Sequence, residues 1–160
     1  MINNFKSHKP QNEFLSSFID MLFFIDIPVE NLTSFQEDII PYPRISFGYF
    51  FDQPYSFTNQ TSKARITEDI IISKICLKNV TVKPKGNRVK IIGGHLKPYA
   101  LSLFTDLSIK ELPKTNTFYD FFNTKSLAIQ KKLNNCKSEI EMFGELETFF
   151  LKNLQQKILI

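Results

Sequence analysis

Tryptophan is missing from this 160-residue chain, and histidine and cysteine occur only twice each. A barrel enzyme that uses a metal needs several histidines and a carboxylate around one ion. Because His8 and His95 are far apart in the sequence, we expect no metal centre and no cofactor. Cys76 and Cys136 form neither a CxxC unit nor a metal-binding spacing, so they predict free thiols in a reducing cytoplasm.

Glycine is also scarce, with five copies, and this excludes the common glycine-rich loops. The pair Gly93-Gly94 lacks the third spaced glycine of a dinucleotide site, and neither a phosphate-binding loop nor a nucleophile elbow is present. The carboxylate pairs Glu37-Asp38 and Glu68-Asp69 flank predicted loops. Neighbours in a strand point to opposite faces, so we interpret these carboxylates as solvated turn residues. We therefore expect a protein that binds, and not an enzyme.

Long apolar runs and a strong excess of one charge are both missing. Residues 14–25 form the most apolar stretch, but Asp20 interrupts it and no signal-peptide cleavage site follows. The net charge is only +4, from 20 basic and 16 acidic residues, whereas a dedicated DNA-binding module has a denser basic face. We expect a cytoplasmic chain with no membrane contact.

What the chain does have is phenylalanine, with 17 copies, and a length that fits one domain. Residues 1–12 are polar and predict a frayed end. The clearest strand is 44–51, in which Ile45, Phe47, Tyr49 and Phe51 share one face. Residues 14–27 predict a strand or a bent strand pair from their aromatic and β-branched content, although periodicity alone leaves a helix open. Further predicted strands are 33–39, 69–77, 79–83 and 88–94. Pro84-Lys85-Gly86-Asn87 predicts a hairpin between the last two.

After Pro98 the apolar residues follow a helical period. This predicts helices over 100–107, 126–134 and 138–157. Capping-box patterns start a short second turn of helix at Ser108 and the last helix at Ser138. The chain thus predicts one α+β domain over 1–160, β-rich over 13–96 and helical over 98–157. The expected architecture is a small cupin-like or jelly-roll β-barrel followed by a C-terminal helical layer.

Two groups of residues are candidates for binding. Inward side chains of a small barrel either fill the interior or line a ligand site, and both interpretations remain open here. The candidate ligand-binding residues are Phe24, Arg44, Phe47 and Tyr49. The last predicted helix has an apolar stripe that either packs on the barrel or contacts a second subunit. The candidate dimer-interface residues in that stripe are Phe143, Leu146, Phe150 and Leu154.

The order of these segments resembles the N-terminal sensor domain of AraC-type transcription regulators, in a divergent subgroup. The resemblance covers about residues 14–156. It is carried by Gly94-His95-Leu96-Lys97-Pro98, by 101–107 and 108–112, by Tyr119-Asp120-Phe121-Phe122, by 146–154, and upstream by Ile40-Pro41 followed by 45–49. His95 stands where the family often has arginine, and Tyr42-Pro43-Arg44 replaces an acidic-glycine turn.

The resemblance implies a regulatory domain that binds a small-molecule effector and forms a homodimer. It implies contact with DNA only through a helix-turn-helix region that this chain does not contain. The abrupt apolar end at 158–160 favours a piece of a longer regulator. A stand-alone module that binds a small molecule or a protein is the alternative.

Overall fold

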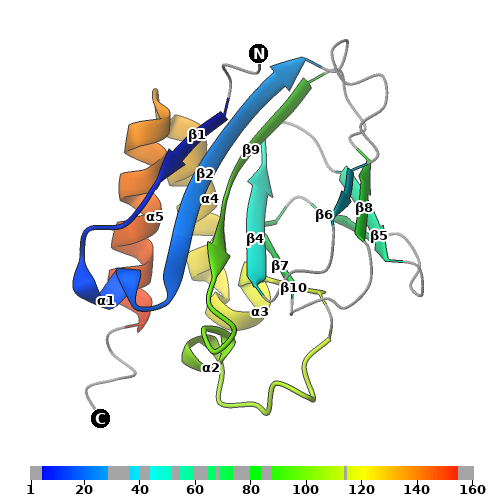
Figure 1. The fold of residues 1–160 in the computed structure, drawn as a ribbon, viewed down its shortest axis with the longest axis vertical. Helices are drawn as coiled ribbons and strands as arrows, with labels where there is room; N and C mark the ends of the chain where they lie inside the picture. The colour runs from blue at the N-terminus through cyan, green and yellow to red at the C-terminus, as the bar shows by residue number, and fades with distance from the viewer. Residues whose placement is uncertain are drawn as a thin grey trace.

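The computed structural model describes residues 5–28, 44–51, 69–73, 88–113 and 115–154, and the backbone of 37–39, 55–59, 65–67 and 80–83. Within these residues the chain has the predicted α+β fold, with strands first and helices last (Figure 1). Cys76, the loop 84–87 and the apolar end 158–160 lie outside the described residues.

A six-stranded antiparallel sheet forms the centre of the fold. Its order is β1-β2-β9-β4-β7-β10, with bounds β1 (Phe5–His8), β2 (Ile19–Pro28), β9 (Arg88–Leu96), β4 (Ile45–Phe50), β7 (Ile71–Ser73) and β10 (Thr115–Thr117). Among the described residues β1 and β10 are its two edges, and the sheet does not close on itself.

A second, smaller antiparallel sheet has four strands. Its order is β3-β8-β5-β6, with bounds β3 (Glu37–Ile39), β8 (Val80–Lys83), β5 (Tyr55–Asn59) and β6 (Arg65–Thr67). It lies beyond β4 on the right of Figure 1. The predicted hairpin is wrong, because β8 pairs with β3 and β5 whereas β9 pairs with β2 and β4. The segment between β8 and β9 therefore joins the two sheets.

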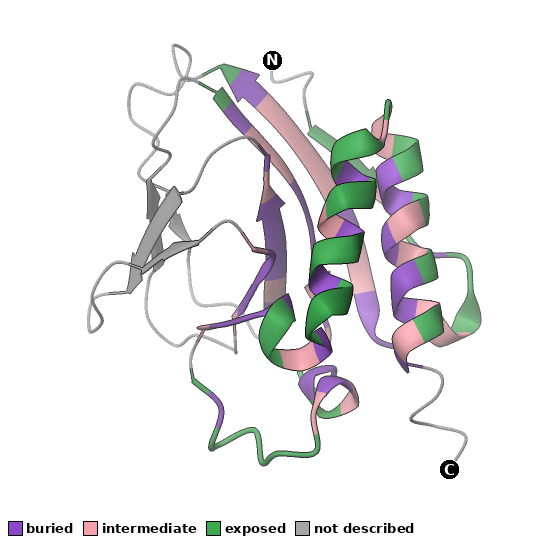
Figure 2. Ribbon diagram, turned by 180° about the vertical axis from the view of Figure 1, so that it is seen from behind, coloured by how far each residue is buried: buried purple, intermediate pink, exposed green. Residues whose placement is uncertain are grey.

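The longer helices cover one face of the six-stranded sheet. The helices are α1 (Glu13–Ser16), α2 (Leu101–Phe104), α3 (Phe118–Phe122), α4 (Thr124–Asn135) and α5 (Glu139–Leu154). Seen from behind in Figure 2, α4 and α5 stand in front of the strands and turn their buried residues toward them. None of the described helices is long and apolar enough to cross a lipid bilayer.

The core lies between this face and the helices, and phenylalanine rings fill much of it. The predicted alternation in β4 is confirmed, because Ile45, Phe47, Tyr49 and Phe51 are all buried. Phe118 of α3 is at the centre of the ring contacts. Its ring centroid lies 5.6 Å from Phe47, 6.4 Å from Phe104, 5.8 Å from Phe149 and 6.0 Å from Phe150.

The N-terminal segment differs from its prediction. Phe5–His8 is not frayed but pairs with β2, with Phe5 opposite Ile25 and His8 opposite Leu22. The His8 ring stacks on Phe143 at 5.2 Å and its Nε2 bonds the Glu147 carboxylate, so α5 holds the strand in place.

The first residues of the predicted strand 14–27 are helical. The side chain of Asn12 accepts a hydrogen bond from the backbone N–H of Leu15 at 3.1 Å and starts α1. An asparagine in this position is a common helix start, and it outweighs the aromatic content that favoured a strand.

The two predicted capping boxes have different outcomes. Ser138 does start α5, since its hydroxyl accepts from the N–H of Glu141 at 3.3 Å. Residues 108–111 form only a turn, closed by the N–H of Glu111 on the carbonyl of Ser108 at 2.9 Å. A reciprocal capping box that the prediction missed begins α3, between Thr117 and Asp120.

Strand β9 runs through its two glycines to Leu96. A β-carbon on Gly93 would lie 2.3 Å from the carbonyl oxygen of Phe47, and one on Gly94 would lie 2.7 Å from the ring of Phe47. The glycine pair therefore allows β4 and β9 to approach closely, and it does not mark a turn.

This close approach gives a stability prediction. We expect Gly93→Ala to lower the free energy of unfolding by at least about 2 kcal/mol, because backbone must move to admit the new methyl group. Gly144 of α5 has no atom within 4 Å of the β-carbon position, so Gly144→Ala should raise stability by about 0.5–1 kcal/mol. Urea unfolding followed by circular dichroism measures both changes. Equal stabilities of the two variants would contradict the prediction.

Candidate functional site

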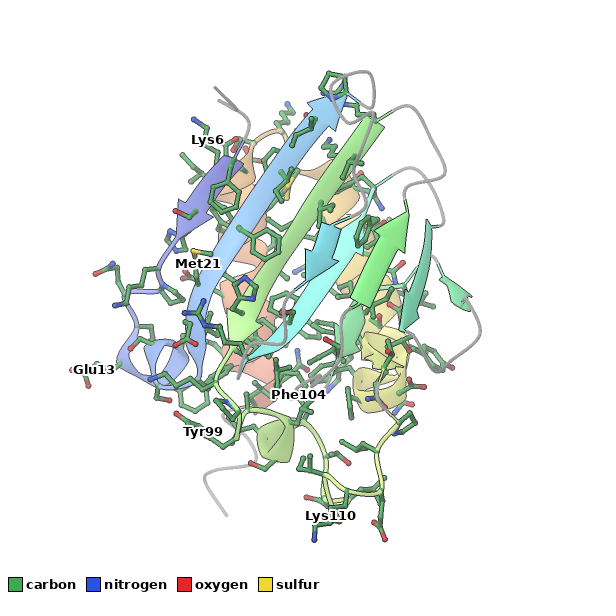
Figure 3. All side chains as sticks on the ribbon, turned by 45° about the vertical axis from the view of Figure 1, so that its right-hand side comes forward. Lys6, Glu13, Met21, Tyr99, Phe104 and Lys110 are labelled. Atoms are coloured by element: carbon green, nitrogen blue, oxygen red, sulfur yellow. The ribbon has the colours of Figure 1, made fainter. Side chains whose placement is uncertain are left out.

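The two faces of the six-stranded sheet are chemically different. The register aligns Leu22 and Phe47 with Gly94, and these residues face the helices. The alternate residues form what we call the far face. Its half-buried side chains are Met21, Phe23 and Ile25 of β2, Ile91 and His95 of β9, and Ser46 and Phe50 of β4. Figure 3 shows Met21 on β2.

Aromatic rings lie along the outer strands of the far face. Phe23 stacks on Phe5 of β1 with the ring centroids 6.3 Å apart, and Phe5 keeps 46% of its surface exposed. The ring of Phe23 also lies 5.3 Å from that of His95. Apolar surface on this face thus borders directly on polar side chains.

A polar cluster, which we define as Asp20, Arg44, Ser46 and His95, spans three adjacent strands at one end of the far face. The hydroxyl Oγ of Ser46 lies 3.0 Å from Nδ1 of His95. Nε of Arg44 lies 3.9 Å from the carboxylate of Asp20, and both side chains are about one third exposed. That distance is too long for a hydrogen bond, so the two charges attract without being joined.

His95 is the group in this cluster whose titration is shifted. Burial lowers the pKa of His95, the positive charge of Arg44 lowers this pKa further, and the carboxylate of Asp20 opposes them. The ring is therefore neutral near neutral pH, and its Nδ1 can accept a hydrogen bond from the Ser46 hydroxyl.

A serine near a histidine also has the geometry of a nucleophile and its base. In the part of the chain that the structure describes, no carboxylate accepts from the second ring nitrogen of His95. Gly94, which precedes His95, and Gly48 both occupy the strand ladder. The arrangement is suited to holding a polar ligand.

The predicted ligand-binding residues do not surround one space. Phe24, Phe47 and Tyr49 share the helix-covered face, where Phe47 and Tyr49 are buried in the core. The Tyr49 hydroxyl accepts a hydrogen bond from Asn134 of α4 at 2.7 Å. Arg44 belongs to the polar cluster at the end of the far face. The prediction found one residue of that cluster, and it missed Asp20, Ser46 and His95.

The predicted dimer-interface residues are in the core of a single chain. The exposed fractions of Phe143, Leu146, Phe150 and Leu154 are 5%, 1%, 0% and 0%. Their stripe packs against the sheet and α3, so it has no free surface for a second copy. The sequence pattern could not separate these two uses, because both require the same helical spacing.

Asp69 is a second polar centre that the prediction interpreted as a solvated turn carboxylate. Its Oδ1 accepts from the Ser126 hydroxyl at 2.5 Å and from Gln130 at 2.6 Å, and its Oδ2 accepts from the N–H of Tyr119 at 3.0 Å. Asp69 precedes β7, so one carboxylate ties the sheet to the start of α3 and to α4. This role is structural.

Among the described residues, no group of three or more His, Cys, Asp or Glu side chains converges as a metal site would require. Cys136 is a free thiol, and burial together with Glu145 and Glu141 raises its pKa.

No known protein-family model matches the chain, and no curated protein matches it in sequence.

The Asp69 contacts predict a loss of stability on truncation. Asp69→Ala leaves the buried Ser126 hydroxyl and the backbone N–H of Tyr119 without this acceptor, and we expect it to lower the free energy of unfolding by about 1–3 kcal/mol. Asp106→Asn, in an exposed loop, is the matched control and should change stability by less than about 0.5 kcal/mol. Chemical denaturation measures both variants, and a loss no larger than the control's would refute this role.

The lowered pKa of His95 predicts a pH dependence. Because the folded state holds the proton less tightly than the unfolded state, the contribution of His95 to stability is complete above about pH 6.5 and is lost as the pH falls below it. The free energy of unfolding should therefore fall more steeply between pH 7 and pH 5 in the parent protein than in His95→Gln. An equal dependence of the free energy of unfolding on pH in the parent protein and in His95→Gln would contradict the prediction.

Proposed function

We propose that the chain is the effector-sensing and dimerisation domain of an AraC-type transcription regulator, acting in the cytoplasm and without catalytic turnover. The observation that carries the proposal is the difference between the two sheet faces. Helices fill one face, whereas the other has half-buried apolar side chains that end at a polar cluster. Such a surface suits a small molecule with an apolar part and a polar part.

The arrangement of elements also supports the proposal. Four of the segments on which the family resemblance rests fall in different elements. Residues 94–98 include the end of β9, 101–107 include α2, 119–122 belong to α3, and 146–154 form the second half of α5. Two antiparallel sheets beside each other are compatible with a flattened barrel, and the proposal includes a cupin-like arrangement of them.

A mechanism follows from the shared strands. An effector on the far face would contact β2, β9 and β4, whose other face packs on the helices through Leu22 and Phe47. An effector changes the helices only if it binds one arrangement of strands and helices better than another. DNA contact would come from helix-turn-helix units attached to this domain.

A reporter fusion tests the proposal. The chain is joined to a DNA-binding unit that represses its operator only as a dimer. We expect repression by the parent fusion and by Gly144→Ala, and loss of repression by the destabilised Gly93→Ala. Sedimentation velocity of the purified chain gives the association constant directly. A chain that stays monomeric in the centrifuge and silent in the reporter would refute the regulatory proposal.

The far face equally supports a stand-alone binding module. The coding sequence downstream of Ile160 distinguishes the two functions. Two helix-turn-helix patterns there support the regulator, and a stop codon supports the module.

A further inference from the structure

We propose that the polar cluster recognises the ammonium and carboxylate groups of a free α-amino acid with an apolar side chain. This inference rests on the proposed sensing function, because it names the chemical class of the effector. It is drawn from the charges, the spacing and the apolar neighbours of Asp20, Arg44, Ser46 and His95.

The first reason is the pair of opposite charges. Asp20 and Arg44 lie 3.9 Å apart and are both partly exposed. Among the described residues, no donor is hydrogen-bonded to the Asp20 carboxylate, so its oxygens can accept from an incoming ammonium group. The guanidinium of Arg44 presents a fork of donors that suits a carboxylate. An α-amino acid carries both groups on one carbon, at a spacing that matches two neighbouring side chains of opposite sign.

The second reason is the uncharged pair between these ions. Ser46 and His95 lie on β4 and β9, and β9 separates β2, which carries Asp20, from β4. A neutral imidazole and a hydroxyl can orient a bound polar group without adding net charge. A zwitterion offers its ammonium group to Asp20 and its carboxylate to the Arg44 guanidinium, whereas a simple anion is repelled by Asp20.

The third reason is the apolar surface beside the cluster. Met21 adjoins Asp20 in sequence, and Phe23 contacts the His95 ring at 5.3 Å. Alternate residues of a strand repeat about every 6.6 Å, so a side chain of the size of leucine or phenylalanine reaches from the cluster to Phe23. Ile91, four residues along β9 from His95, lies about 13 Å away and is beyond that reach.

Calorimetric titration of the purified chain with four small molecules tests the inference. We expect saturable binding of L-phenylalanine. 3-Phenylpropionate lacks the ammonium group, phenylalanine amide lacks the carboxylate and imitates the first residue of a peptide, and L-glutamate has a charged side chain. Each of the three should bind at least about tenfold more weakly, since each loses a charge-assisted contact or places a charge on apolar surface.

Variants assign the two charged contacts. Asp20→Asn should lower the affinity for L-phenylalanine at least about tenfold, because the contact with the ammonium group is lost. The affinity for 3-phenylpropionate should not fall, because this molecule has no ammonium group. Arg44→Gln should weaken L-phenylalanine by a similar factor and leave phenylalanine amide unchanged. The matched controls are Asp26→Asn and Arg88→Gln. They break a salt bridge of 2.5 Å between β2 and β9, at the other end of the sheet, and should leave binding unchanged.

Three results would overturn the inference: no saturable binding by the folded chain, equal binding of L-phenylalanine and either blocked analogue, or unchanged binding by Asp20→Asn and Arg44→Gln with melting temperatures like the parent's. These failures are separable from failure of the regulatory proposal. A reporter fusion that represses while the titration is flat refutes only the amino-acid site. If the chain binds L-phenylalanine but the fusion stays monomeric and does not repress the reporter, only the regulatory proposal is refuted.

Discussion

The contact of Phe118 with the rings around it holds the helices on one face of the sheet, and the rest of the structure depends on this contact. Phe118 is fully buried, and its neighbours come from β4, α2 and α5. An aromatic pair contributes about 0.5–1.5 kcal/mol beyond the burial of its area, so several pairs on one ring form a strong joint. The capping box of Thr117 and Asp120 and the bond from Tyr119 to Asp69 fix the backbone that carries this ring. Rings and polar caps thus cooperate at the start of α3.

The functional asymmetry follows from that joint. Once the helices cover one face, the rings of Phe47 and Tyr49 in β4 are used for packing. A ligand cannot reach Phe47 or Tyr49 without displacing α4 or α5. The central positions of the far face on β4 and β9 are Gly48 and Gly93, and the side chains of Phe23, Ile91 and Phe50 lie over them. Glycine lets the strands pack closely there. Ser46 and His95, the next pair along the same face, remain partly accessible.

Much of the fold could be predicted from residue patterns, and particular failures show what patterns omit. The alternation of Ile45, Phe47 and Tyr49 identified β4 and its buried face, and the spacing of Phe143 and Phe150 identified α5. The spacing shows that a helix has an apolar face but not what covers that face. The stripe of α5 was therefore also predicted as a dimer interface, whereas it packs against the sheet and α3 of the same chain. The hairpin at 84–87 failed for a related reason. Turn residues predict that the chain reverses, whereas pairing decides which sheet each strand joins.

The candidate site was largely hidden from the sequence because its residues are brought together across strands. Arg44 was chosen as a polar group near aromatic residues, and it does belong to the cluster, but its partners come from β2 and β9. Asp69 shows the same limit, since a carboxylate beside a loop has no sequence signal for Ser126 and Gln130 far along the chain. Only the backbone pairing supplies these neighbours.

A register shift explains why Asp20 reaches the polar cluster. In a regular strand Asp20 would share the face of Leu22 and Phe24, where a carboxylate would be buried against the helices without a partner. The pairing of β2 with β9 shifts between Ile19 and Met21. Ile19 thereby keeps the core face opposite Leu96, and Asp20 approaches Arg44 and His95. Bulges of this kind redirect side chains next to binding sites. The extra residue at Asp20 therefore removes a charge from the core and supplies the negative half of the polar cluster in one step.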